Sequence, residues 1–157
     1  MSNEQRHRKF DRDVLYLPAA SGTVIEQGDL VAYDASNHAA YPASSETWDT
    51  DLATTQANFA DNFVGVAITA SPDGCEEVGV ATDGIFEFEC AAAVFDPGDP
   101  IGPADSGSNS IEDQKVASAV AASSVGAVVK YYGSNTTAVL VRIASKLIPS
   151  NANISLG

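Results

Sequence analysis

The second half of this chain roughly repeats the first, and the repeat limits the fold more than any other feature of the sequence. Gly28-Asp29-Leu30-Val31 opens one copy, and Gly98-Asp99-Pro100-Ile101 opens the other about 70 residues later. Valine-rich segments then follow in the same order, at 63–67 and 78–81 in the first copy and at 124–128 and 138–141 in the second. Repeated strand-and-turn units of this kind commonly close on each other into one β body. We therefore expect an all-β protein, a compact β-barrel or sandwich built from two related halves at about 28–82 and 98–143.

Length and composition agree with a single domain. A chain of 157 residues with 45% hydrophobic residues can bury a substantial core. Ala and Val dominate the apolar residues, and small or β-branched side chains suit twisted sheets. We expect at most one or two short helices. The predicted organisation is a flexible basic arm at 1–13, a single β domain at 14–148 and a loose tail at 149–157.

Alternating and apolar runs predict the individual strands. The expected strands lie at 14–18, 30–33, 63–69, 78–82, 85–89, 116–120, 125–132 and 137–143. The first copy carries an insertion at 42–62, which we expect to hold one short helix from about Thr50 to Phe59. For residues 112–122 a helix is the alternative, but the repeat favours a strand there.

Turn and loop residues separate these strands. Ser71-Pro72-Asp73-Gly74 has strong turn chemistry, and Gly133-Ser134-Asn135 predicts a second turn. Pro97, Pro100 and Pro103 predict a stiff loop that is not helical.

The two cysteines, Cys75 and Cys90, have no surrounding cluster of metal ligands. If Asp83-Gly84 forms a two-residue hairpin turn, the two sulfurs lie diagonally on one face, with Cα atoms about 7–8 Å apart. That separation is marginal for a disulfide. We expect free thiols.

Charge is distributed unevenly along the chain, whose net charge is −13. Four of the eight Lys and Arg residues are in the first twelve positions: Arg6, Arg8, Lys9 and Arg12. The acidic remainder should repel nucleic acid and anionic membranes, so we expect neither as a partner. The basic arm is the part suited to a negative partner; the alternative is an unstructured tail that aids solubility.

Targeting signals are not evident in the sequence. The polar N-terminus lacks the apolar segment of a signal peptide, and no run is long and apolar enough to span a membrane. We expect synthesis in the cytoplasm.

The only tryptophan, Trp48, lies in the 42–62 insertion. It is interpreted as a hydrophobic anchor that fixes this loop to the body. The alternative is an exposed contact for a partner.

Residue patterns for catalysis are missing. Nucleophilic triads need a histidine near Ser or Cys, yet His7 lies in the arm and His38 in an expected turn. Glu87 and Glu89 are interpreted as the solvated face of a strand, and Asp96-Pro97-Gly98-Asp99 as a capped turn rather than a calcium loop. We expect no catalytic residues, no metal and no cofactor, and therefore no enzyme.

The order of these motifs resembles the small head-decoration, or capsid cement, proteins of tailed bacteriophages. The resemblance runs from about Leu30 to Ile143 and rests on these segments: Val64-Gly65-Val66-Ala67, Val78 to Val80, Gly84-Ile85-Phe86-Glu87-Phe88, Gly98-Asp99, Val125-Gly126 and Thr137 to Ile143. It implies a compact β-barrel or sandwich on the outer face of the virion capsid. It implies the major capsid protein as partner and a homo-oligomer, with a trimer favoured.

Two features depart from the family pattern. The 42–62 insertion is longer than the family implies, and Pro100 stands where the family often has an apolar strand residue. Both concern the contact surface. The alternatives are another phage structural component, such as a tail or fibre-base module, and a non-catalytic ligand-binding β module. The residues predicted to bind a partner are Arg6, Arg8, Lys9, Arg12 and Trp48.

Overall fold

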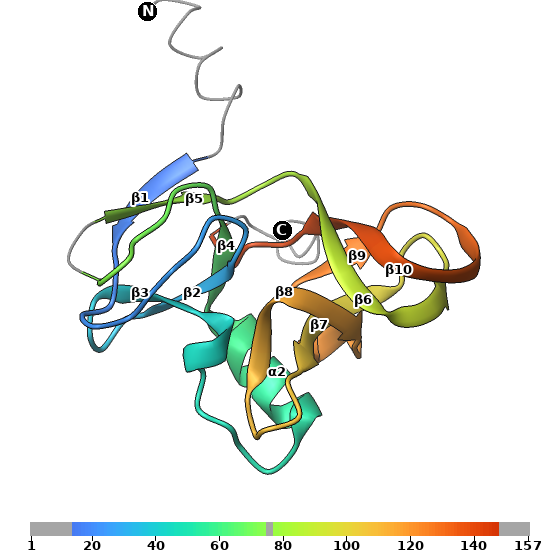
Figure 1. The fold of residues 1–157 in the computed structure, drawn as a ribbon, viewed down its shortest axis with the longest axis horizontal. Helices are drawn as coiled ribbons and strands as arrows, with labels where there is room; N and C mark the ends of the chain where they lie inside the picture. Colours follow the sequence, from blue (N-terminus) through green and yellow to red (C-terminus); the bar gives the residue numbers. More distant parts are fainter. Residues whose placement is uncertain (1–13, 75–76, 148–157) are drawn as a thin grey trace, which may run out of the picture.

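The computed structural model describes residues 14–74 and 77–147, which form two β-sheets with a shared core (Figure 1). One sheet has five strands in the order β1-β5-β4-β2-β3, and the other is a closed barrel in the order β10-β6-β8-β7-β9. Strands dominate, and α2 is the α-helix within the described residues. The prediction of an all-β barrel or sandwich with few short helices is confirmed.

Each sheet comes from one continuous stretch of chain. The first unit, residues 14–81, contains β1 (Val14–Pro18), β2 (Leu30–Asp34), β3 (Ala39–Pro42), the 3-10 turn η1 (Ala43–Ser45), α2 (Leu52–Asn62), β4 (Phe63–Ala67) and β5 (Glu77–Ala81). The second unit, residues 85–143, contains β6 (Ile85–Phe95), β7 (Pro100–Asp105), β8 (Ile111–Ser118), η2 (Ala121–Ser123), β9 (Gly126–Val128) and β10 (Tyr132–Ile143).

The two units have the same strand pairing. In the first, β2 lies between β3 and β4, and β5 lies between β4 and β1; in the second, β7 lies between β8 and β9, and β10 between β9 and β6. A parallel contact then joins the outer strands: Cys90 pairs with Val116 between β6 and β8, and Ala19 bridges to Ala40 on β3. The structural unit is therefore longer than the repeat seen in the sequence. It begins one strand earlier, with β1 in the first unit and with β6 in the second.

The Gly-Asp turn before the second strand of each unit has one geometry. The carboxylate Oδ2 of Asp29 accepts from the N–H of Glu26 at 2.8 Å, and that of Asp99 accepts from the N–H of Asp96 at 2.8 Å. Gly28 and Gly98 have φ of 99° and 97°, a left-handed conformation that favours glycine. The prediction that residues 96–99 form a capped turn is confirmed.

Glycine is also required where strands cross closely. A Cβ on Gly65 would lie 2.0 Å from the carbonyl oxygen of Ala81, and a Cβ on Gly126 would lie 2.3 Å from that of Arg142. These are equivalent places in the two units, in β4 beside β5 and in β9 beside β10. The Val-Gly pairs of the sequence repeat mark these crossings.

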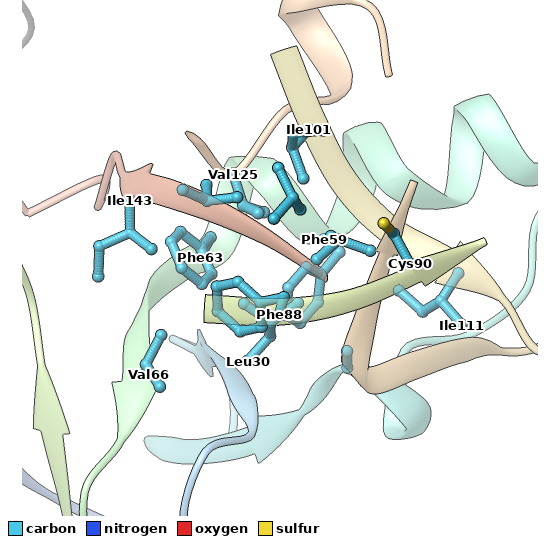
Figure 2. Close-up of a cluster of buried hydrophobic side chains, with 14 of the residues drawn as sticks. Leu30, Phe59, Phe63, Val66, Phe88, Cys90, Ile101, Ile111, Val125 and Ile143 are labelled. Atoms are coloured by element: carbon cyan, nitrogen blue, oxygen red, sulfur yellow. The ribbon is translucent and has the colours of Figure 1, made fainter. Parts of the chain in front are cut away.

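The interiors of the two units are built from equivalent positions. Strand register matches these buried pairs: Ile25 with Phe95, Val31 with Ile101, Ala40 with Val116, Val64 with Val125, Ala67 with Val128, Val78 with Val139, and Val80 with Val141. The interior of the second unit continues into the contact with the first, where Phe59 and Phe63 approach Phe88 (Figure 2). The two units are thus joined by apolar packing as well as by the chain.

Helix α2 occupies most of the insertion, and it begins and ends slightly later than predicted. Asp51 caps it by accepting from the N–H of Thr54 at 2.8 Å. Its buried side chains are Thr55, Gln56 and Phe59. The amide of Gln56 donates to the carbonyl of Pro103 at 2.7 Å, and Ser123 Oγ donates to the carbonyl of Ala53 at 3.0 Å. The insertion of the first unit therefore packs against the second.

Asp83-Gly84 does not form a hairpin turn, so this prediction is wrong. β5 pairs with β1 and β4, whereas β6 pairs with β10 and β8. Residues 82–84 instead link the two units, and the diagonal arrangement derived for Cys75 and Cys90 no longer applies. Cys90 is a free, buried thiol, and Cys75 lies outside the described residues.

Two loop predictions in the second unit are also wrong. Pro100 begins β7 and Pro103 lies in it, because proline is tolerated at the first residue of a strand and beside a register shift. Gly133-Ser134-Asn135 lies within β10, whose pairing with β6 shifts register between Tyr132 and Ala138. For residues 112–122 the strand prediction is confirmed over 112–118, which lie in β8, and is wrong over 119–122, where no strand forms and η2 begins.

Candidate interaction surfaces

Lys and Arg are absent from the sequence of the first unit, although Lys146, after the second unit, places its Nζ 6.0 Å from the ring centroid of Tyr33 in β2. Residues 13–114 contain no Lys or Arg and nineteen Asp and Glu residues. The cations of the described residues all lie in the second unit or just after it: Lys115, Lys130, Arg142 and Lys146. The contrast drawn from the sequence, between a basic arm and an acidic body, missed this division between the two units.

The four basic residues of the N-terminal arm, Arg6, Arg8, Lys9 and Arg12, lie outside the described residues. Trp48 is described. It lies between η1 and α2, is half-buried and packs against the shared core. It also lines an open depression of about 430 Å³ together with Glu46, Asp49 and Asp61. Its side chain is therefore both packed and partly accessible.

A neighbouring depression of about 490 Å³ lies beside β3 and shares Glu46 and Asn62 with the first. Tyr41 donates its hydroxyl to Glu46 Oε2 at 2.7 Å, and burial, reinforced by Glu46, raises the Tyr41 pKa far above its usual value. Asp34 accepts from the N–H of Ser36, which lowers the pKa of Asp34. Asp34 therefore stays ionised in mild acid.

The second unit carries an open hollow of about 730 Å³, here called the hollow, where β7, β9 and β10 meet. Small side chains line most of it, including Pro100, Ala121 and Ala127. Arg142 at its edge forms an ion pair with Asp83, with Nη2 3.4 Å from Oδ2, and remains 60% exposed. The second unit thus presents a concave surface with the ion pair of Arg142 and Asp83 at its edge.

Two large apolar side chains are exposed beside the hollow. Ile85 is 52% exposed and pairs directly with Arg142 across β6 and β10. Val120 is 62% exposed and precedes Ala121 in the chain. Apolar residues at the border of a concave surface are typical of interaction sites.

Groups able to do chemistry are dispersed over residues 14–74 and 77–147, where no three His, Cys, Asp or Glu side chains could hold a metal ion. His38 is exposed in the turn between β2 and β3. Cys90 donates to the carbonyl of Thr136 at 3.5 Å, and burial raises its pKa, which disfavours the thiolate. Glu87 and Glu89 are exposed on β6 with Phe88 buried between them, as the alternation predicts.

No helix among residues 14–74 and 77–147 is long and apolar enough to cross a membrane. The chain matches no family model, no curated protein and no solved structure. The fold and the surface together define a β protein of two equivalent five-stranded units with concave, charged outer surfaces.

Proposed function

We propose that this protein is a structural virion protein that binds the outer surface of a tailed-phage capsid and stabilises the shell. The observation that carries the proposal is that the motifs behind the resemblance recur at equivalent positions of the two units. The Gly-Asp turns cap the second strand of each unit, and Gly65 and Gly126 mark the same strand crossing. Several residues behind the resemblance are therefore ones that the backbone conformation or the close approach of two strands requires.

The surface suits a protein present in many copies. A net charge of −13 favours solubility at high local concentration. Modest contacts become strong when they are repeated on a lattice, since avidity multiplies them. In this proposal the partner is the major capsid protein, the protein is a homo-oligomer with a trimer favoured, and it acts without catalysis or cofactor. It is made in the host cytoplasm and resides on the outer face of the virion.

The N-terminal arm is proposed to strengthen the attachment. Arg6, Arg8, Lys9 and Arg12 would contact an acidic patch of the major capsid protein or of a neighbouring subunit. Their charge contrasts with the nineteen acids and the absence of Lys and Arg in residues 13–114. Trp48 is proposed as a further contact with the partner, through the part of its side chain that lines the depression.

Binding to purified capsids tests the proposal. The full chain and a variant lacking residues 2–12 are mixed with heads that lack decoration, and sedimented protein is quantified. We expect the full chain to sediment with the heads, and the deletion to weaken binding more at low than at high salt. A full chain that stays in the supernatant contradicts the function, whereas unchanged binding by the deletion contradicts only the role of the arm.

A further inference from the structure

One face of the repeated unit is covered in the first unit and open in the second. In the first unit Leu30, Ala43 and Val66 are at most 2% exposed, because they lie in the core cluster that also contains Phe59 of α2 and Phe88 of the second unit. Strand register places Pro100 and Ala127 at the positions of Leu30 and Val66. Ala121 begins η2 as Ala43 begins η1.

The open counterpart of this face is the hollow. Pro100, Ala121 and Ala127 all line it. The side chains at these positions are smaller than Leu30 and Val66, so the surface is concave where the first unit is filled. Ile85 and Val120 add exposed apolar area at its border. The second unit therefore presents, unoccupied by its own chain, the face that the first unit uses for docking.

The surface on which the first unit docks also has a counterpart. Within the chain, Gln114 donates to Asp29 Oδ1 at 2.8 Å, so the Gly-Asp turn of the first unit rests on β8. Pro42 pairs with Val31 in the first unit, and Ser118 pairs with the equivalent residue, Ile101, in the second. Pro42 and Ser118 are therefore equivalent. Four residues before each of them lie His38 and Gln114, which makes His38 the equivalent of Gln114. His38 lies in an exposed turn, residues 35–38.

Charge favours a contact between unlike units. The first unit contains no Lys or Arg, whereas the second unit contains three, and one of them, Arg142, lies at the edge of the hollow in an ion pair with Asp83. The second unit has seven Asp and Glu residues against three Lys and Arg residues, so a contact between a second unit and a first unit is less repulsive than a contact between two first units. An interface that uses different surfaces on the two partners is heterologous, and it produces a ring or an open chain of copies.

We propose that this protein self-associates head to tail, with the hollow of one copy seated on the β2–β3 turn of the first unit of a second copy. The contact repeats between copies the part of the internal arrangement that the strands and the Gly-Asp turn make, whereas the packing of α2 has no counterpart because the second unit has no equivalent helix. His38 takes the place of Gln114 and donates an N–H to Asp99, whose Oδ2 is held by Asp96. The smaller apolar side chains of the hollow make this contact weaker than the internal one.

The test is sedimentation equilibrium of the full chain alone. We expect concentration-dependent association of the wild type. Ala127→Glu in the hollow and His38→Glu in the turn should each weaken it at least about tenfold. The matched control is Val94→Glu, at a residue 58% exposed on β6 and outside both surfaces, which should leave association unchanged. His38→Gln restores the amide found at Gln114 and should associate.

A mixture of the two variants, each with one of the two surfaces blocked, distinguishes a heterologous interface from an isologous one, in which both copies use the same surface. Each retains one intact surface, so an equimolar mixture of Ala127→Glu and His38→Glu should form dimers and nothing larger. A wild type that is monomeric at every concentration overturns the proposal, as does association that survives Ala127→Glu. Circular dichroism verifies folding, and Ala121→Glu replaces any hollow variant that does not fold.

The capsid is absent from this measurement, so its failure contradicts the proposed homo-oligomer in solution but leaves the proposed binding to the capsid standing. Monomeric wild type whose binding to heads is abolished by Ala127→Glu would assign the hollow to the capsid and overturn self-association.

Discussion

At the residue scale, the glycines of the Val-Gly pairs are the most constrained positions. The close approach of Arg142 to Gly126 leaves no room for a side chain. The sequence repeat identifies these glycines as equivalent, but sequence reasoning could not tell that the reason is a strand crossing. That information lies in contacts between residues distant along the chain.

We predict that Gly126→Ala destabilises the fold by about 2–3 kcal/mol, because the added Cβ must displace backbone. Chemical denaturation of the purified protein measures this. The matched control is Gly107→Ala, where open space surrounds the Cβ and only the left-handed φ of 85° opposes the change. It should cost about 1 kcal/mol. Equal losses for the two variants would contradict the crossing as the cause.

Asp51 gives a pH-dependent prediction at the same scale. The backbone N–H of Thr54 lowers the pKa of Asp51 below 3.8 in the folded state. Its contribution to stability is therefore present above pH 3.8 and is lost as the pH falls through the lowered value. Asp51→Ala should lower the Tm at pH 7, and the difference from wild type should shrink on acidification below pH 3.8. Asp51→Asn, which can still cap the helix, should lose less; a difference that does not depend on pH would contradict the role of the carboxylate.

At the element scale, the strands with clear alternation were predictable and the irregular ones were not. β1 and the first half of β6 follow from their residue patterns, and an insertion with one helix was expected where α2 lies. β7 was missed because its prolines indicate a loop, and the whole length of β10 was missed because a Gly-Ser-Asn run indicates a turn. Long-range pairing overrode local preference in both strands.

The contact between α2 and the second unit is testable through Gln56. Its amide is buried and donates to the carbonyl of Pro103. We predict that Gln56→Ala costs about 1–3 kcal/mol in the free energy of unfolding, because a buried carbonyl loses its partner. Asn58→Ala, two residues further along α2 at an exposed position, should change stability by less than about 0.5 kcal/mol. Denaturant titrations compare the two, and equal effects would argue against Gln56 as a contact between the units.

At the scale of the whole molecule, the repeat has a consequence for surfaces as well as for the fold. Ile25 and Phe95 fill equivalent interiors, yet the outer positions differ, with Leu30 buried and Pro100 lining the hollow. The sequence indicates two related halves but not which face of each is covered. Which face of a unit is buried depends on how the two units pack together. The contacts that α2 and β8 make between the units leave no repeating pattern in the sequence that could have predicted this packing.

The central claim is that this protein acts as a repeated component of a viral shell. The most direct measurement is the ratio of bound protein to major capsid protein on purified heads at saturation, with the temperature at which those heads rupture. We predict a fixed stoichiometric ratio and a higher rupture temperature than for undecorated heads. A few copies per particle, or saturation that leaves the rupture temperature unchanged, would contradict it.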